Sequence, residues 1–241
     1  MAPQLSYVVF TDFDGTITRN DIGDIMFKTF GEQDESARAV HETGGRTFEA
    51  QENWRRSCET VSALSPEMFR SFLDRQEIDE RFHRFEQFCS EKLIPIHILS
   101  DGFDLYIEHI LRREKLGHLP FYSNRLSIGS DGMITPVFPH TDAECFLCAN
   151  CKRNHLLTKS SDENVIVYVG NGHSDHCPAR YADVVFAKGT LLKFCERENV
   201  TYHRYETFDD VLEKFRSLCE EGRPRKRRTA ELARKDMFMR E

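Results

Sequence analysis

The sequence lacks any long hydrophobic run. No apolar segment approaches the ~18 residues that a membrane-spanning helix needs, so no span is expected. The opening stretch MAPQLSYVVF also lacks the basic region and cleavage site of a signal peptide. With no sign of secretion, the eight cysteines are expected to be reduced thiols, and the expected location is the cytoplasm.

Most of the chain also lacks an excess of positive charge. The formal net charge is −7 over 241 residues, which argues against nucleic acid as the main ligand. Residues 222–241 differ, because they hold eight Lys or Arg against three acids. This basic tail is expected to be a solvated terminal helix or a disordered end, with a nuclear address or a nucleic-acid patch as the alternative.

What the sequence does contain is SYVVFTDFDGTIT at residues 6–18. Residues 7–11 are apolar, β-branched or aromatic, which predicts a buried strand. Asp12 and Asp14 follow it, and alternate residues of an extended segment face the same way. We therefore expect both carboxylates at the carboxyl end of the strand, where open α/β sheets bind ligands. A hard cation, Mg²⁺ above all, suits them, and a plain Asp-Gly turn is the alternative.

The DFDGTIT segment resembles the first motif of the haloacid dehalogenase (HAD) phosphohydrolases. The next stretch, residues 20–78, shows helical spacing of apolar residues and no parallel strand, and it resembles the helical cap of many HAD phosphatases. Strands and helices alternate afterwards, with a hairpin-like excursion at residues 121–139. The expected fold is α/β, with a Rossmann-like parallel sheet covered by helices on both faces. The expected domains are a core at 1–19 and 79–221, a cap at 20–78 and the basic tail at 222–241.

A second strand, expected at Ile94–Leu99, ends in Ser100, Asp101 and Gly102 before a helix. A hydroxyl and free amides at a helix start form an anion site, although Ser100 could equally be an ordinary helix cap. The segment resembles HAD motif two, whose Ser or Thr binds phosphate. Close relatives often have Gly where this chain has Asp101, so we expect that carboxylate to point away from the phosphate.

Three cysteines, Cys145, Cys148 and Cys151, stand at CxxCxxC spacing. They could bind Zn²⁺ with His140 or Cys177 as a fourth ligand, but a fourth ligand at reliable spacing is missing, and a thiol-rich turn is the alternative.

Lys152 follows the cysteines and resembles the lysine of HAD motif three, with Lys159 as the alternative. A buried strand expected at Asn164–Val169 ends in GNGHSD, which resembles motif four, usually GDxxxD. The chain departs from that motif at Asn171, whose amide oxygen can bind Mg²⁺ without a negative charge, and it retains Asp175.

The resemblance implies that Asp12 is a nucleophile forming an aspartyl-phosphate, and that Asp14 is a general acid and base. It implies that Lys152 neutralises the charge of the phosphate and the nucleophile, and that Lys152 and Ser100, with the Asp101-Gly102 segment, bind the phosphate. The implied Mg²⁺ ligands are listed last: Asp12, Asp14 through its backbone carbonyl, Asn171 and Asp175.

A small phosphomonoester is the expected substrate. The CxxCxxCK element is similar to the 2-hydroxy-3-keto-5-methylthiopentenyl-1-phosphate phosphatases of methionine salvage, while GNGHSDHCP leans towards the phosphocholine-type group. Phosphoserine and phosphoethanolamine phosphatases are neighbouring subgroups. A non-catalytic binding protein on the same fold, suggested by Asn171, is a second class of function.

Overall fold

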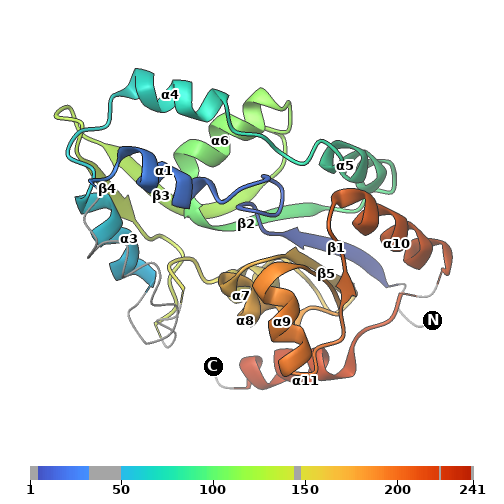
Figure 1. Ribbon diagram of the computed structural model, residues 1–241. Coiled ribbons are helices and arrows are strands. Elements are labelled where there is room, and N and C mark those ends of the chain that lie inside the picture. The colour runs from blue at the N-terminus through green and yellow to red at the C-terminus, as the bar shows by residue number, and fades with distance from the viewer. Residues whose placement is uncertain (1–4, 33–49, 144–147, 223, 240–241) are drawn as a thin grey trace. The chain divides into compact units, whose positions relative to one another are not determined.

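The computed structural model of the chain describes residues 5–32, 50–143, 148–222 and 224–239 (Figure 1). Its seven-stranded sheet has the order β4-β3-β2-β1-β5-β6-β7. The chain forms two compact units. Unit 1 comprises Met1–Arg19, Ile78–Leu99 and Lys152–Glu241, and unit 2 comprises Asn20–Glu77 and Ser100–Cys151. Strand β2 (Ile96–Phe103) contributes its first half to unit 1 and its second half to unit 2.

The strands of unit 1 are parallel. Strand β1 (Ser6–Thr11) pairs with β2 on one side and with β5 (Asn164–Gly170) on the other. Strands β6 (Val184–Ala187) and β7 (His203–Arg204) continue the sheet beyond β5. The apolar, β-branched runs that predict these strands are buried on both faces, as parallel strands require. The predicted α/β fold is therefore confirmed.

Helices of unit 1 pack around this sheet. They are α5 (Phe82–Glu91), α7 (Lys152–Thr158), α8 (His176–Tyr181), α9 (Gly189–Arg197), α10 (Phe208–Glu220) and α11 (Arg228–Phe238). A 3₁₀ turn at His173–Asp175 precedes α8. Phenylalanines join α5 to α10, with ring centroids of Phe82 and Phe208 4.8 Å apart. Each fully buried Phe contributes about 2 kcal/mol, so this contact is a substantial part of the core.

Unit 2 contains α1 (Ile22–Phe30), α3 (Ala50–Glu59), α4 (Pro66–Asp74) and α6 (Asp104–Arg113). It also contains an antiparallel hairpin of β3 (Phe121–Ile128) and β4 (Ile134–Val137), which confirms the predicted excursion. Asp21 caps α1 by accepting a hydrogen bond from the amide of Asp24 at 2.8 Å. An aromatic cluster forms part of the core: Phe27, Trp54 and Phe103.

Two features differ from the sequence expectations. Strand β2 runs through Ser100 to Phe103 instead of ending at Leu99, because the buried Phe103 continues the apolar pattern. The division into compact units also differs from the expected domains. Unit 2 joins residues 100–151 to the segment predicted as a cap, and residues 222–241 belong to unit 1. Among the described residues, no helix is both long enough and apolar enough to span a membrane.

Candidate active site

The candidate site lies at the carboxyl edge of the sheet in unit 1. Asp12 directly follows β1, Asn171 follows β5 and Lys188 follows β6. Parallel strands present these ends at one edge, so residues far apart in the sequence meet there. The register brings Thr11 opposite Val169, which sets Asp12 close to the start of the Asn171 loop. Asp12 is only 5% exposed, so it acts in a largely dry environment.

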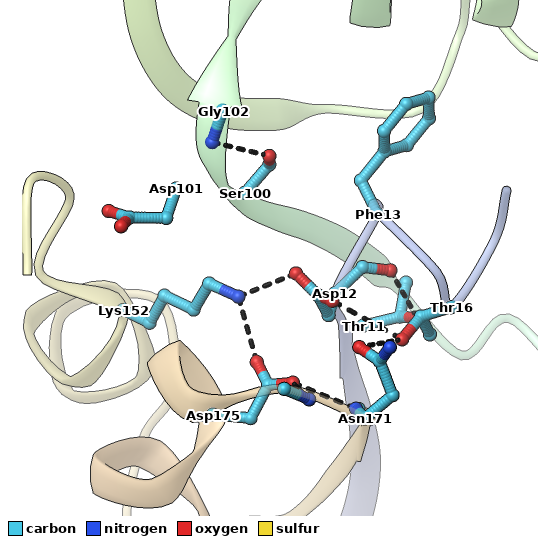
Figure 2. Close-up of polar contacts among 12 residues, drawn as sticks. Thr11, Asp12, Phe13, Thr16, Ser100, Asp101, Gly102, Lys152, Asn171 and Asp175 are labelled. Atoms are coloured by element: carbon cyan, nitrogen blue, oxygen red, sulfur yellow. Dashed lines mark hydrogen bonds and ion pairs between the residues drawn. The ribbon is translucent and has the colours of Figure 1, made fainter. Parts of the chain in front are cut away.

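A buried lysine joins two carboxylates at this edge. Lys152 Nζ lies 2.5 Å from Asp12 Oδ1 and 2.7 Å from Asp175 Oδ1 (Figure 2). Burial alone would lower the pKa of Lys152, but the attraction of Asp12 and Asp175 outweighs it and raises that pKa. Lys152 therefore stays charged. The exposed Lys159 is not needed for this role.

Asp12 experiences opposing influences. Burial raises the pKa of its carboxyl group, and repulsion from Asp175 and Asp14 adds to the rise. The ammonium group of Lys152 acts in the other direction. The net effect is a raised pKa for Asp12, and removing Lys152 would raise it further.

Asp175 is saturated with hydrogen bonds. Besides Lys152, its carboxylate accepts from the Tyr168 hydroxyl at 2.5 Å and from the amides of Asn171 and Gly172, both at 2.8 Å. It is fully buried. A Cβ atom on Gly170 would approach Asp175 Oδ2 to 2.5 Å, so the strand must end in glycine here. The four contacts fix the carboxylate and leave it little capacity for another ligand.

Asn171 and Asp12 share one hydroxyl. Thr16 Oγ1 lies 3.2 Å from Asp12 Oδ2 and 3.1 Å from Asn171 Oδ1. Gly15 has φ +68°, and a Cβ atom there would approach Asn171 Nδ2 to 2.5 Å. Glycine is therefore required both for the turn and for the close approach of the amide. A carboxyl oxygen of Asp12 and the amide oxygen of Asn171 thus meet at the Thr16 hydroxyl.

This donor set fits Mg²⁺. The ion is usually held by one or two carboxylates, with water and substrate phosphate in its other positions. Asp12 Oδ2 and Asn171 Oδ1 supply hard oxygens at one place, and Asp14 is near enough to influence Asp12. Within the described parts of the chain, no group of three or more His, Cys, Asp or Glu is arranged for a metal ion.

The predicted phosphate-binding residues lie in unit 2. Ser100 is fully buried in β2, and its Oγ accepts a hydrogen bond from the amide of Gly102 at 2.9 Å. Asp101 Oδ1 accepts from the amide of Asn150 at 2.7 Å. The Asn150 side chain in turn donates to the carbonyls of Ser100 at 2.7 Å and Tyr122 at 2.9 Å. Asp101 thus tethers the segment that leads into Lys152.

The cysteine cluster lies partly outside the described residues, because Cys145 falls there. Cys148 is partly exposed and Cys151 is buried. The backbone amide of Cys151 donates to the carbonyl of His140 at 2.7 Å. The zinc expectation gains no support from these residues.

Some residues of the site were not singled out in the sequence. Tyr168 holds Asp175, and its signal was its position two residues before Gly170 on the same face of the strand. Lys188 lies directly after β6, like Asp12 after β1, and its Nζ lies 4.9 Å from the centroid of the Tyr205 ring. Burial lowers the pKa of Lys188, although Asp79, Glu206 and Asp12 oppose that effect. The position of Lys188 directly after a predicted strand could have marked it as a residue of the site.

The family model described as Putative Phosphatase matches residues 7–191. The 2-hydroxy-3-keto-5-methylthiopentenyl-1-phosphate phosphatase of Bacillus cereus (strain ATCC 14579) is 30% identical over 223 residues, covering 90% of this chain and 99% of the relative. The protein of the same name from Bacillus thuringiensis (strain Al Hakam) is 32% identical over 224 residues, with the same coverage.

Solved structures agree on the fold. A phospho-aspartyl intermediate analogue of phosphoserine phosphatase matches with a TM-score of 0.65 at 18% identity, covering 88% of this chain and 99% of that one. Cytosolic 5'-nucleotidase IIIB bound to cytidine matches with a TM-score of 0.58 at 15% identity, covering 90% and 86%. The family match, the curated relatives and the strand-end acids around Lys152 lead to one conclusion: the chain belongs to the Putative Phosphatase family of HAD-like enzymes and is a phosphatase.

Proposed function

We propose that the chain hydrolyses a small phosphomonoester through a phosphoaspartyl intermediate on Asp12, with Mg²⁺ as cofactor. The observation that carries this proposal is the buried Lys152 ammonium held between Asp12 and Asp175. A phosphoryl group in transfer is highly anionic, and a fixed cation beside the nucleophile stabilises it without reorganisation. Lys152 also favours the ionised, nucleophilic form of Asp12, against the burial and the neighbouring acids that raise its pKa.

In the first step, an oxygen of Asp12 bonds to phosphorus and the ester P–O bond breaks. Asp14 gives its proton to the leaving alcohol. In the second step, Asp14 takes a proton from water, the water oxygen bonds to phosphorus, and the bond to Asp12 breaks. The resemblance of its segment to motif two supports a role for Ser100 in binding the phosphate. Mg²⁺, when bound by Asp12, the Asp14 carbonyl and Asn171, supplies charge that balances the phosphate.

We propose that Asp175 serves as the anchor of the site. Its four hydrogen bonds support a role in orienting Lys152 and the Asn171 loop, with Mg²⁺ reached only through that loop. For the substrate, the curated relatives favour the methionine-salvage ester 2-hydroxy-3-keto-5-methylthiopentenyl-1-phosphate. Two phosphatases named for that ester match this chain over 99% of their own length.

Phosphate release from a panel of esters tests the proposal. The panel holds the salvage ester, phosphoserine, phosphocholine and phosphoethanolamine, each with Mg²⁺ and with EDTA. Asp12→Asn should lose at least about a thousandfold in turnover. Asp162→Asn makes the same change on an exposed side chain and should behave as wild type. Release from none of the esters by the wild type would favour a binding protein instead.

The intermediate has its own test. Borohydride reduces an acyl phosphate to an alcohol, so quenching during turnover should convert residue 12 to homoserine, detectable by mass spectrometry of the peptide. The Asp162→Asn control should give the same product. Turnover without homoserine at residue 12 would exclude the phosphoaspartyl route while leaving the phosphatase activity in place.

A further inference from the structure

A buried carboxylate in unit 1 is neutralised by the C-terminal basic segment. Asp183 lies just before β6, and its side chain is completely buried. Its Oδ2 accepts a hydrogen bond from the amide of Ile166 at 2.8 Å. Its Oδ1 accepts from the amide of Arg227 and from Arg234 Nη2, both at 3.0 Å. A buried charge needs such partners, so the segment is held to unit 1 by a specific ionic contact.

The same two arginines cap the end of α8. Arg227 Nη2 donates to the carbonyl of Ala179 at 2.7 Å and to that of Arg180 at 2.9 Å. Arg234 Nη1 donates to the carbonyl of Tyr181. The last carbonyls of a helix lack partners inside the helix, and cations are favoured at that end. Helix α11 lies beside α8, and its Ala230 is fully buried (Figure 1).

The opposite end of α8 carries the site. Asp175 directly precedes His176, the first residue of α8, and holds Lys152 and the amides of Asn171 and Gly172. His176 itself stacks on Phe194 of α9, with ring centroids 4.2 Å apart. A six-residue helix is only about 9 Å long. A shift of the backbone at Tyr181 would therefore also move Asp175 at the other end of the helix.

We propose that Arg227 and Arg234 are positioning residues for the phosphatase reaction. By fixing the carboxyl end of α8, they hold Asp175 where it orients Lys152 and the Asn171 loop. The role in catalysis rests on the proposed function of Lys152, whereas the structural coupling through α8 does not. Two arginines of a segment that the sequence predicts to be a solvated basic tail would thus help to position the residues of the site.

The test combines kinetics with hydrogen exchange in the full-length chain. In the Arg227→Gln/Arg234→Gln variant, the amides of Asn171 and Gly172 should exchange about tenfold faster, because both donate to Asp175. The kcat should fall about tenfold with KM within about twofold, since misplacement of a catalytic group lowers the rate of the chemical step. Arg227→Lys/Arg234→Lys should restore part of both, because it keeps the charge at the helix end.

The matched control is Arg228→Gln/Lys235→Gln, which removes the same charge from exposed positions of α11 and should leave both readouts unchanged. A second reference is the amide of Phe208, which donates to Asp79 at 2.7 Å elsewhere in unit 1. If this amide accelerates as much as those of Asn171 and Gly172, the arginines act only on general stability and the proposal fails.

Two further outcomes are decisive. A folded double variant with wild-type exchange at Asn171 and Gly172 and wild-type kcat would overturn the proposal. If the double variant does not fold, Arg227→Gln alone keeps the Arg234–Asp183 contact and is judged by the same exchange readout. Exchange needs no turnover, so a wild type without phosphatase activity would defeat the proposed function and still leave this coupling measurable.

Discussion

At the scale of single residues, Asn171 is the position where this chain departs from the motif it resembles. Its Oδ1 shares the Thr16 hydroxyl with Asp12, and an amide oxygen brings no negative charge. Asn171→Asp adds a charged ligand without changing the size of the side chain. Since ligand charge tunes cation affinity, we expect the Kd for Mg²⁺, measured by calorimetry, to fall roughly tenfold.

The same substitution should lower the thermal unfolding midpoint in EDTA, because the new carboxylate would repel that of Asp12, with which residue 171 shares the Thr16 hydroxyl. Asn199→Asp makes the identical chemical change at an exposed position and serves as the control for Mg²⁺ affinity. Equal Mg²⁺ affinity in wild type and Asn171→Asp would show that residue 171 takes no part in binding the cation.

At the scale of elements, one asparagine, Asn150, ties the end of β2 to β3 within unit 2. Asn150→Ala removes the donors to the carbonyls of Ser100 and Tyr122, and should cost about 2 kcal/mol of unfolding free energy in urea.

Asp101→Ala should cost about 1 kcal/mol, because the amide of Asn150 loses its acceptor. Asp101→Asn keeps an acceptor oxygen and is the matched control. A loss as large for Asp101→Asn as for Asp101→Ala would mean that charge, not this hydrogen bond, holds the segment.

Element by element, the sequence predicts strands better than their ends. The β-branched runs before Asp12 and Asn171 predict buried strands, because such continuous apolar runs are typical of a parallel sheet covered on both faces. The parallel pairing of β1 and β5 then brings the residues that follow them to one edge of the sheet. The end of β2 was missed, since Ser100, Asp101 and Gly102 favour a turn locally while the burial of Phe103 extends the strand. The Asp101–Asn150 hydrogen bond joins residues 49 positions apart, which no local pattern could indicate.

At the scale of the whole chain, charge is unevenly distributed along the sequence. The net charge is −7 although residues 222–241 are basic, and such a run is usually solvated. In the structure, the guanidinium of Arg234 and the backbone amide of Arg227 both contact the buried carboxylate of Asp183. Burial of Asp183 depends on tertiary packing, so the docking of α11 could not be predicted from composition.

Acid sensitivity of the whole fold follows from two half-buried histidines of unit 1. His97 stacks on Phe10 of β1, and His203 lies against Phe186 of β6. Burial lowers the pKa of each below 6.5, and Lys159 and Lys214 respectively add to the effect. As the pH falls through 6.5, the unfolded chain takes up protons before the folded chain does. Stability is therefore complete above about pH 6.5 and declines below it.

Urea unfolding at pH 7.5 and pH 5.5 measures this decline. Each histidine is partly exposed, so its share should be at most about 1 kcal/mol. His97→Gln and His203→Gln remove the titrating group, and each variant should lose less stability between the two pH values than the wild type does. His118→Gln changes an exposed histidine and should keep the wild-type difference. If both variants kept the wild-type difference, the acid sensitivity between these two pH values would have to come from His176, whose pKa burial also lowers.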